Sequence, residues 1–225
     1  GIYNYGGRVA VSGSITVDGS IYGISNPANS TFTAGAVTVS NTSNSGIHNR
    51  GTFTVTGDVT IDKAANHGIN LGGNMKVAGN MVIKNVTNHG IVINGGSNDN
   101  VDNSSLIMGA DEENITGSIL IYSDADESNV VHGIYNNASG VKIIANEISI
   151  NDTKNTGLRF AGGNGLLEVK TKLTIEKVTA SSQYGFTINS TNSTAKVRDM
   201  EIKDINGTAL YTRGTLIATG NVSIA

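Results

Sequence analysis

The chain has 225 residues, with 29 glycines, one proline and no cysteine. The lack of cysteine excludes disulfides, thiolate metal sites and cysteine nucleophiles. The formal net charge of -3 and the scattered Lys and Arg residues provide no basic surface for phosphates, so a nucleic-acid partner is not expected. No apolar run approaches the ~18 residues of a membrane span, and we expect neither a membrane-inserted segment nor a signal peptide in this sequence.

A small residue followed by an apolar one returns about every 22 residues. It stands at Gly1-Ile2, Gly23-Ile24, Gly46-Ile47, Gly68-Ile69, Gly90-Ile91, Gly133-Ile134, Gly157-Leu158, Gly185-Phe186 and Ala209-Leu210. A period in this range predicts a stack of similar units. Because no atypical polar unit stands at either end, we expect the chain to be a piece of a longer array.

Each unit contains three short segments in which apolar residues alternate with polar ones, as in 46–49, 52–55 and 58–61. Alternation at period two is typical of strands with one buried face. The third segment is the clearest of the three. Its inward pairs are Ile15/Val17, Val37/Val39, Val59/Ile61, Met81/Ile83, Ile119/Ile121, Ile148/Ile150, Leu173/Ile175, Met200/Ile202 and Val222/Ile224.

A second set of glycines precedes the third segment and predicts a corner with positive φ, which glycine tolerates best. Its members are Gly13, Gly35, Gly57, Gly79, Gly117 and Gly220. Asn146 takes this place in one unit, and asparagine is the next most tolerant residue. Thr171 and Arg198 take it in two others, so we expect the corner to change shape there.

These columns predict an all-β fold: a right-handed single-stranded parallel β-helix, or solenoid, of about 9–10 coils with three short strands per coil. Strands stacked ~4.8 Å apart would make a rod about 45 Å long. Residues 1–225 are expected to form one continuous body, since the repeat runs through the whole chain.

The spacing of 43 residues between Gly90 and Gly133 interrupts the period. One coil with insertion loops at about 94–116 and 124–129 explains it best, because a single segment, 119–121, matches the third-strand pattern. Long insertions in a solenoid are often its binding elements. The candidate partner-binding residues are therefore the polar residues of these loops: Asn98, Asp99, Asp102, Asp111, Glu112, Glu113, Asp124, Asp126 and Glu127.

The unit 46–61, with its glycine, aliphatic and Asn/Ser/Thr positions, resembles the passenger regions of bacterial autotransporter adhesins with a pertactin-like β-helix. The resemblance covers essentially the whole chain. It implies a non-catalytic segment displayed on the bacterial surface and tethered by an outer-membrane domain that this chain lacks. Its partners would be host or bacterial surface proteins or glycans, and its rods could associate with one another.

Two other functions remain open. The same fold occurs in pectin-degrading polysaccharide lyases and hydrolases, but this chain lacks the paired aspartates that such hydrolases share. Acid and base catalysis on a glycosidic bond needs carboxylates that meet across a cleft. A third possibility is a rigid spacer stalk that holds a distal binding domain. No catalytic residue and no cofactor is expected.

His67, His89 and His132 each precede a repeat glycine, so we expect them to lie above one another at a corner. Such a column would be a metal or pH-sensitive site, or a polar ladder without a ligand. The acidic runs 111–114 and 124–128 would be Ca²⁺ loops or simply solvated loops, since neither has the spacing of a known calcium motif. Exposed tyrosines offer stacking surfaces for sugars or proteins. The amides of Asn4, Asn26, Asn49 and Asn136 are expected to bridge successive corners.

Overall fold

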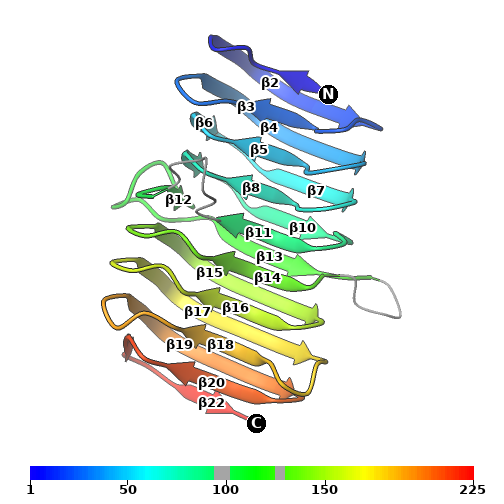
Figure 1. Ribbon diagram of the computed structural model, residues 1–225. Coiled ribbons are helices and arrows are strands. Elements are labelled where there is room, and N and C mark those ends of the chain that lie inside the picture. Colours follow the sequence, from blue (N-terminus) through cyan, green and yellow to red (C-terminus); the bar gives the residue numbers. More distant parts are fainter. Residues whose placement is uncertain (94–101, 125–129) are drawn as a thin grey trace.

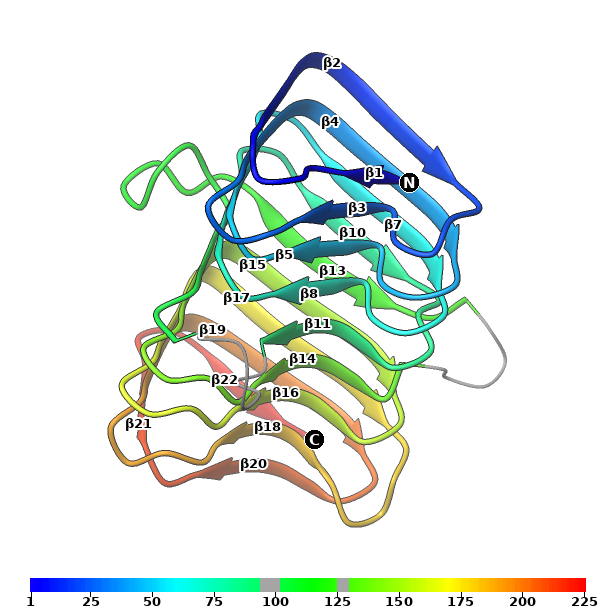
Figure 2. The same cartoon turned by 45° about the horizontal axis from the view of Figure 1, so that its top comes forward.

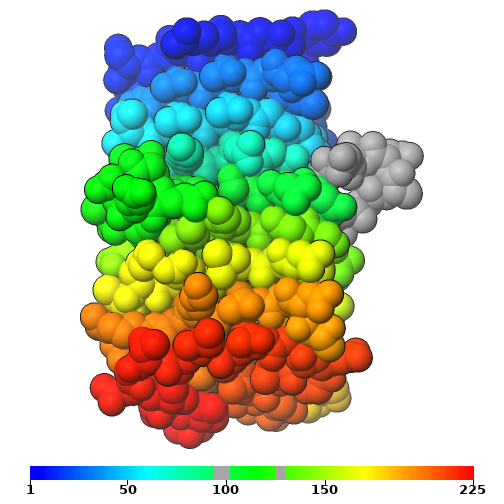
Figure 3. Space-filling view, turned by 90° about the vertical axis from the view of Figure 1, so that its left-hand side faces the viewer, coloured from blue at the N-terminus to red at the C-terminus, as the bar shows by residue number. Residues whose placement is uncertain are grey.

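The computed structural model shows an all-β parallel β-solenoid of about nine turns, which confirms the predicted fold class (Figure 1). It describes residues 1–93, 102–124 and 130–225. Successive coils stack along one axis from the N-terminus to the C-terminus, and the space-filling view shows them as successive bands (Figure 3). No helix with the length and apolar character needed to span a membrane occurs in the described part of the chain.

The first segments of the coils form a nine-stranded parallel sheet. Its strands, in spatial order, are β1 (Ile2–Tyr3), β3 (Ile24–Asn26), β5 (Ile47–Asn49), β8 (Ile69–Leu71), β11 (His89–Ile93), β14 (His132–Asn136), β16 (Thr156–Phe160), β18 (Tyr184–Ile188) and β20 (Thr208–Thr212). Its inward column runs in register from Ile2 through Ile24 and Ile47 to Leu210, as the repeat predicted.

The second and third segments form a thirteen-stranded sheet. Its strands are β2 (Arg8–Asp18), β4 (Thr31–Thr42), β6 (Thr52–Val55), β7 (Val59–Ala64), β9 (Asn74–Val77), β10 (Met81–Lys84), β12 (Ser105–Ile107), β13 (Ser118–Tyr122), β15 (Lys142–Thr153), β17 (Leu166–Val178), β19 (Thr194–Ile205), β21 (Thr215–Ala218) and β22 (Val222–Ile224). All pairings within it are parallel.

The expected three short strands per coil are not seen in every coil. In β2, β4, β15, β17 and β19 the second and third segments run as one strand that bends between them (Figure 2). The second-segment column also continues through Leu106, Ile143 and Leu167, which the sequence pattern had not revealed. The interior between the two sheets is apolar, and it includes a stacked pair of rings, Phe32 and Phe53, with centroids 4.7 Å apart.

The glycines before the third segment do not have positive φ, so the predicted reason for them is wrong. From Gly35 onward they are needed because adjacent coils approach closely at this bend, whereas Gly13 in the first coil has nothing within 4 Å of an added Cβ. A Cβ on Gly57 would lie 2.8 Å from the backbone oxygen of Gly35, and one on Gly117 would lie 2.1 Å from that of Gly79. Asn146 likewise has no positive φ.

The bend changes shape at Thr171, as expected, because β17 has one residue more there than its neighbours. Lys170 and Thr171 stand opposite Asn146 in β15 and opposite Arg198 in β19. The extra residue forms a β-bulge, which increases the local bend of a strand. Arg198 fills the same bend as a single residue.

Positive φ occurs instead just after the third segment. Besides Gly19, the residues with φ between 52° and 58° at this corner are Asn41, Lys63, Asn85, Asp152, Lys177 and Asp204. Asparagine and aspartate tolerate the left-handed region, whereas a lysine there costs about 1–2 kcal/mol. The next residue points inward, and Ala64, Val86 and Val178 are at most 1% exposed. This confirms the prediction that an apolar residue packs beneath the corner.

The interrupted coil consists of β11, β12 and β13. These strands pair with β8, β9 and β10 of the preceding coil, and β11 pairs with β14 while β12 and β13 pair with β15 of the following one. Strand β12 lies within the stretch 94–116 that was assigned to an insertion. The described residues 108–117 therefore leave the coil between β12 and β13, and the strand ladders continue on both sides of them.

Candidate functional site

Five of the nine polar residues proposed for partner binding lie in the part of the chain that the structure describes. Asn98, Asp99, Asp126 and Glu127 lie outside the described residues. Asp102, Asp111, Glu112 and Glu113 precede β13, whereas Asp124 follows it, so the described residues of the set stand at opposite ends of this strand.

The loop between β12 and β13 is held by its own acidic residues. Asp111 Oδ1 accepts the backbone N–H groups of Glu113 at 2.9 Å and Asn114 at 2.8 Å, and the Asn114 side chain also donates to it. The Asn114 amide is the main reason that the pKa of Asp111 is lowered. Glu112 pairs with Lys142 at 2.9 Å. These contacts give Asp111 and Glu112 a role in fixing the loop.

This loop covers an apolar spot on the outer face of the sheet. Because Leu106 and Ile143 face the core, their neighbours Ile107 and Ile144 face outward, yet each is only 2% exposed. The ion pair between Glu112 of the loop and Lys142 of β15 holds the loop over this face. On the other side, Asp102 Oδ1 accepts the N–H of Ser139 at 2.9 Å. The insertion is therefore part of the packing of this coil.

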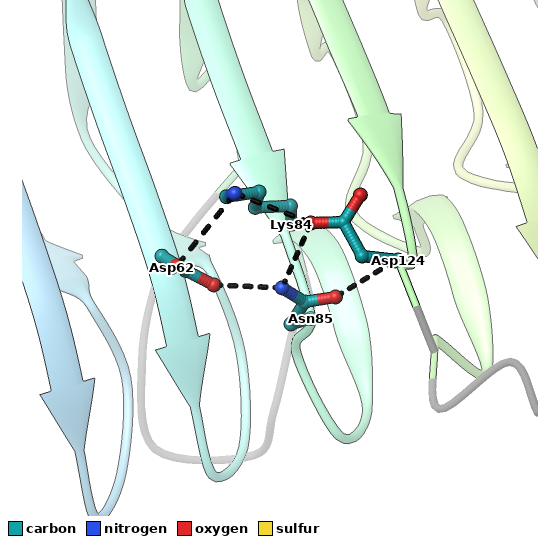
Figure 4. A network of polar contacts seen from close by, with 4 residues as sticks. All are labelled: Asp62, Lys84, Asn85 and Asp124. Atoms are coloured by element: carbon teal, nitrogen blue, oxygen red, sulfur yellow. Dashed lines mark hydrogen bonds and ion pairs between the residues drawn. The ribbon is translucent and has the colours of Figure 1, made fainter. Parts of the chain in front are cut away.

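Asp124 belongs to a charged corner at the ends of the third strands (Figure 4). The Lys84 ammonium lies 3.2 Å from Asp124 and 3.8 Å from Asp62, and both carboxylates raise its pKa, the hydrogen bond to Asp124 most. Asn85 donates to Asp62 at 2.9 Å and accepts the N–H of Asp124 at 2.8 Å. A lysine thus supplies the positive charge between the carboxylates. Whether the acidic loops bind Ca²⁺ stays a prediction.

The three histidines do lie above one another, as expected. The ring centroids of His67 and His89 are 5.0 Å apart and those of His89 and His132 are 4.9 Å apart, with the rings packed edge to face. All three side chains are half-buried. Burial lowers the pKa of His67 to about 4, of His89 to about 3 and of His132 to about 4. The rings are therefore neutral at pH 7.

The ring nitrogens of this column do not converge on one point. His132 Nδ1 accepts the backbone N–H of Thr156 at 3.2 Å, while the buried Nδ1 atoms of His67 and His89 have no hydrogen-bond partner among the described residues. In the described ranges, no group of three or more His, Cys, Asp or Glu side chains is arranged to hold a metal ion. The edge-to-face packing instead makes the column a ladder of rings.

Tyrosine rings extend this ladder, although the sequence pattern did not place the tyrosines next to the histidines. Tyr135 contacts both His89 and His132, with centroids 5.0 and 5.1 Å apart, and the guanidinium of Arg159 lies 5.2 Å from the Tyr135 centroid. Tyr22 stacks on His48, and Tyr184 lies against Tyr211. We call this outward-facing set the aromatic stripe. It consists of Tyr22, His48, His67, His89, His132, Tyr135, Tyr184 and Tyr211.

The repeat glycine explains why histidines and tyrosines from different positions meet. A Cβ on Gly133 would point at Ile150 in the core, 2.4 Å from its Cγ2. Gly133 and Ile134 are thus two successive inward positions, so His132 before them and Tyr135 after them both face outward. Simple alternation along the strand would place these rings on opposite faces, which is why the sequence pattern did not reveal the stripe.

Three comparisons with known proteins found no relative. A scan against models of protein families gave no match, and neither a search of curated proteins nor a search of solved structures gave one. Support for a function therefore comes from the fold and from the chemistry of the surfaces described above.

Proposed function

We propose that this chain is a non-catalytic attachment segment of a bacterial surface protein, of the passenger type that the repeat resembles, and that it binds its partner through the aromatic stripe. The observation that carries this proposal is the contrast between two candidate surfaces. Asp111, Glu112 and Asp124 are engaged in contacts within the chain, whereas the stripe presents rings on the flank of every coil from β3 to β20 except that of β16. Aromatic side chains provide large contact areas with little loss of conformational entropy.

The lowered pKa values of four carboxylates favour a binding role over glycan cleavage. A general acid for a glycosidic bond needs a raised pKa. Asp199 and Glu201 border a depression of about 260 Å³, but their pKa values are lowered, mainly by the Asn221 N–H for Asp199 and by Lys172 for Glu201. The pKa values of Asp18 and Asp111 are lowered too.

The test is a binding screen of the whole chain, labelled at its N-terminus, against bacterial and host cells, matrix proteins and a glycan array. We expect binding that falls in a Tyr135→Ala variant and persists in Tyr122→Ala. Tyr122 is the matched control because its ring lies beneath Lys84 on another face. Circular dichroism checks that both variants keep the fold.

The two alternatives give different results in the same screen. If the isolated chain binds nothing while the full-length protein attaches to cells, the solenoid is a spacer stalk. Release of reducing sugar ends from a pectin-type polysaccharide would identify an enzyme. Display on the bacterial surface, with a tether in an outer-membrane domain, is checked by protease shaving of intact cells followed by detection of fragments of this chain.

A further inference from the structure

The aromatic stripe is uncharged through its central part, which restricts the kind of ligand it can take. The rings of His67, His89 and His132 are neutral at pH 7, and Tyr135 adds a hydroxyl group. The ion pairs of this region, such as Lys84 with Asp62 and Asp124, lie at the ends of the third strands. Two guanidinium groups border the histidine column: that of Arg159 lies over the Tyr135 ring, and that of Arg50 donates to Asn70, the outward residue of β8 that pairs with His48. Desolvating a charged ligand over the histidine rings themselves would be costly without a paired charge.

A ladder of amides runs beside the rings. Asn66 donates to Asn44 at 3.2 Å, Asn88 donates to Asn66 at 3.1 Å, and Asn44 donates to the Tyr22 hydroxyl at 3.1 Å. Each amide has two N–H groups and an oxygen with two lone pairs, so the ladder uses only part of its capacity. The flank therefore offers aromatic surface next to neutral donors and acceptors, which suits a pyranose ring with its apolar C–H face and its rim of hydroxyl groups.

The spacing of the rings favours an extended sugar chain over a peptide. Histidine rings recur every 4.9–5.0 Å along the solenoid axis. An extended β-linked hexose polymer rises by nearly this distance per sugar, so one sugar could lie over each coil. An extended peptide rises about 3.3 Å per residue and repeats its side-chain direction after about 6.6 Å, which falls out of step with the coils.

We propose that the aromatic stripe is a subsite for an uncharged, extended oligosaccharide lying parallel to the solenoid axis, with successive sugars over successive coils. This inference rests on the proposed attachment function and names the ligand class for the same face.

The experiment is a titration of the whole chain with cellohexaose, chitohexaose and mannohexaose, followed by calorimetry and by the NMR signals of its four histidines. We expect at least one neutral hexasaccharide to shift the His89 and His132 signals and to bind about tenfold more tightly than its disaccharide, because additional sugars contact additional rings. Tyr135→Ala and the more exposed Tyr211→Ala should each weaken binding, and Tyr122→Ala should not.

Several outcomes overturn the inference. These are equal affinities for hexasaccharide and disaccharide, an equal loss in Tyr122→Ala, or tighter binding of a hexagalacturonate. If the chain binds cells, matrix proteins or an extended peptide but no neutral oligosaccharide, the ligand class is wrong and the attachment function stands. If the chain binds nothing in either experiment, both proposals fail.

Discussion

Two polar ladders run through neighbouring coils of this solenoid, one inside it and one on its flank. In the first coils, the buried side chains of Asn4, Asn26 and Asn49 bond directly to one another, with N···O distances of 2.9 and 2.8 Å. In the following coils the same inward column becomes apolar at Leu71 and Ile93. There the polar ladder is the outward imidazole column of the aromatic stripe.

The two ladders differ in how well a side chain can form hydrogen bonds with the same kind of side chain in the next coil. A primary amide has donors and an acceptor that match those of the next amide, so an Asn column can be fully buried. A neutral imidazole has one donor and one acceptor, and edge-to-face packing uses neither, which leaves Nδ1 of His67 and His89 without a partner. Asparagine amides do not titrate, whereas imidazoles can bind a proton, so only the amide ladder is insensitive to pH.

The largest expected effect is a loss of stability on mild acidification. The pKa values of His67, His89 and His132 in the folded chain lie below the ordinary value of 6.5, because burial disfavours the cation. As the pH falls below about 6.5 the unfolded chain binds these protons first, so stability is present above this pH and is lost progressively toward pH 4. The urea midpoint at pH 7, 6, 5 and 4.5 measures this loss.

The variant with all three of these histidines changed to asparagine is the control, and its midpoint should vary less over the same range. The lowered carboxylate pKa values contribute only below about pH 5, where the unfolded carboxyl groups begin to protonate, so the interval from about pH 5 to 6.5 isolates the imidazoles. A wild-type midpoint that stays constant from pH 7 to 4.5 would show that the imidazoles are not held neutral by the fold.

The amide ladder is broken by Asn26→Leu, which copies the residue at Leu71 in the same column. The substitution removes the bonds to Asn4 and Asn49 and the bond that Asn26 donates to the Thr52 carbonyl, and Asn49 Oδ1 keeps the Gly51 N–H at 3.2 Å. We expect a loss of about 1–3 kcal/mol, because each of the lost hydrogen bonds contributes roughly 0.5–1.5 kcal/mol. Urea unfolding measures it, and an unchanged midpoint would mean that either kind of side chain serves this column equally.

A smaller effect is expected at Asn136, the isolated amide between Ile93 and Phe160. Its Oδ1 accepts the N–H of Ala138 at 3.0 Å, but its buried Nδ2 has no partner. Asn136→Leu removes that unpaired donor together with one hydrogen bond, and the two effects oppose each other. The unfolding free energy should change by less than about 1 kcal/mol. A loss as large as that of Asn26→Leu would contradict the view that neighbouring amides stabilise one another.

The smallest effect is expected at the charged corner at the ends of the third strands. Asp124→Asn removes the exposed partner of Lys84, and Asp62 remains beside that lysine. Exposed ion pairs contribute little and are screened by salt. The urea midpoint should fall slightly at low ionic strength and match the wild type in 1 M NaCl. A large shift that salt does not reduce would indicate that the corner is structurally required.

The sequence predicted the columns well because each depends on one side chain per coil. Ile15, Val37 and Val59 repeat at one spacing, and a residue that must be buried in every coil leaves a periodic signal. The close approach of coils at Gly57 also left a signal, namely a glycine that recurs before the third segment. The sequence alone does not show whether such a glycine is needed because a side chain would clash or because the backbone has a positive φ. The left-handed corner after the third segment is mostly Gly, Asn or Asp, but Lys63 and Lys177 interrupt this preference and hid it in the sequence.

The aromatic stripe could not be predicted in the same way. It brings together residues from two places in the repeat, and only the successive inward positions Gly133 and Ile134 place His132 and Tyr135 on one face. Two of the acidic residues illustrate what the sequence pattern leaves out. Glu112 and Asp124 looked available in the sequence, but their partners Lys142 and Lys84 come from other coils.

The direction of the hydrogen bonds in the solenoid also determines how it responds to force. In parallel ladders such as β5 to β8 to β11, the bonds join one coil to the next, so tension along the axis pulls directly across them. The coils would then detach one at a time rather than shear together. Each released coil of 22 residues would add roughly 70 Å of chain. Under load the rod would yield in small steps and limit the force reaching whatever it holds, and optical tweezers would record this as a regular sawtooth.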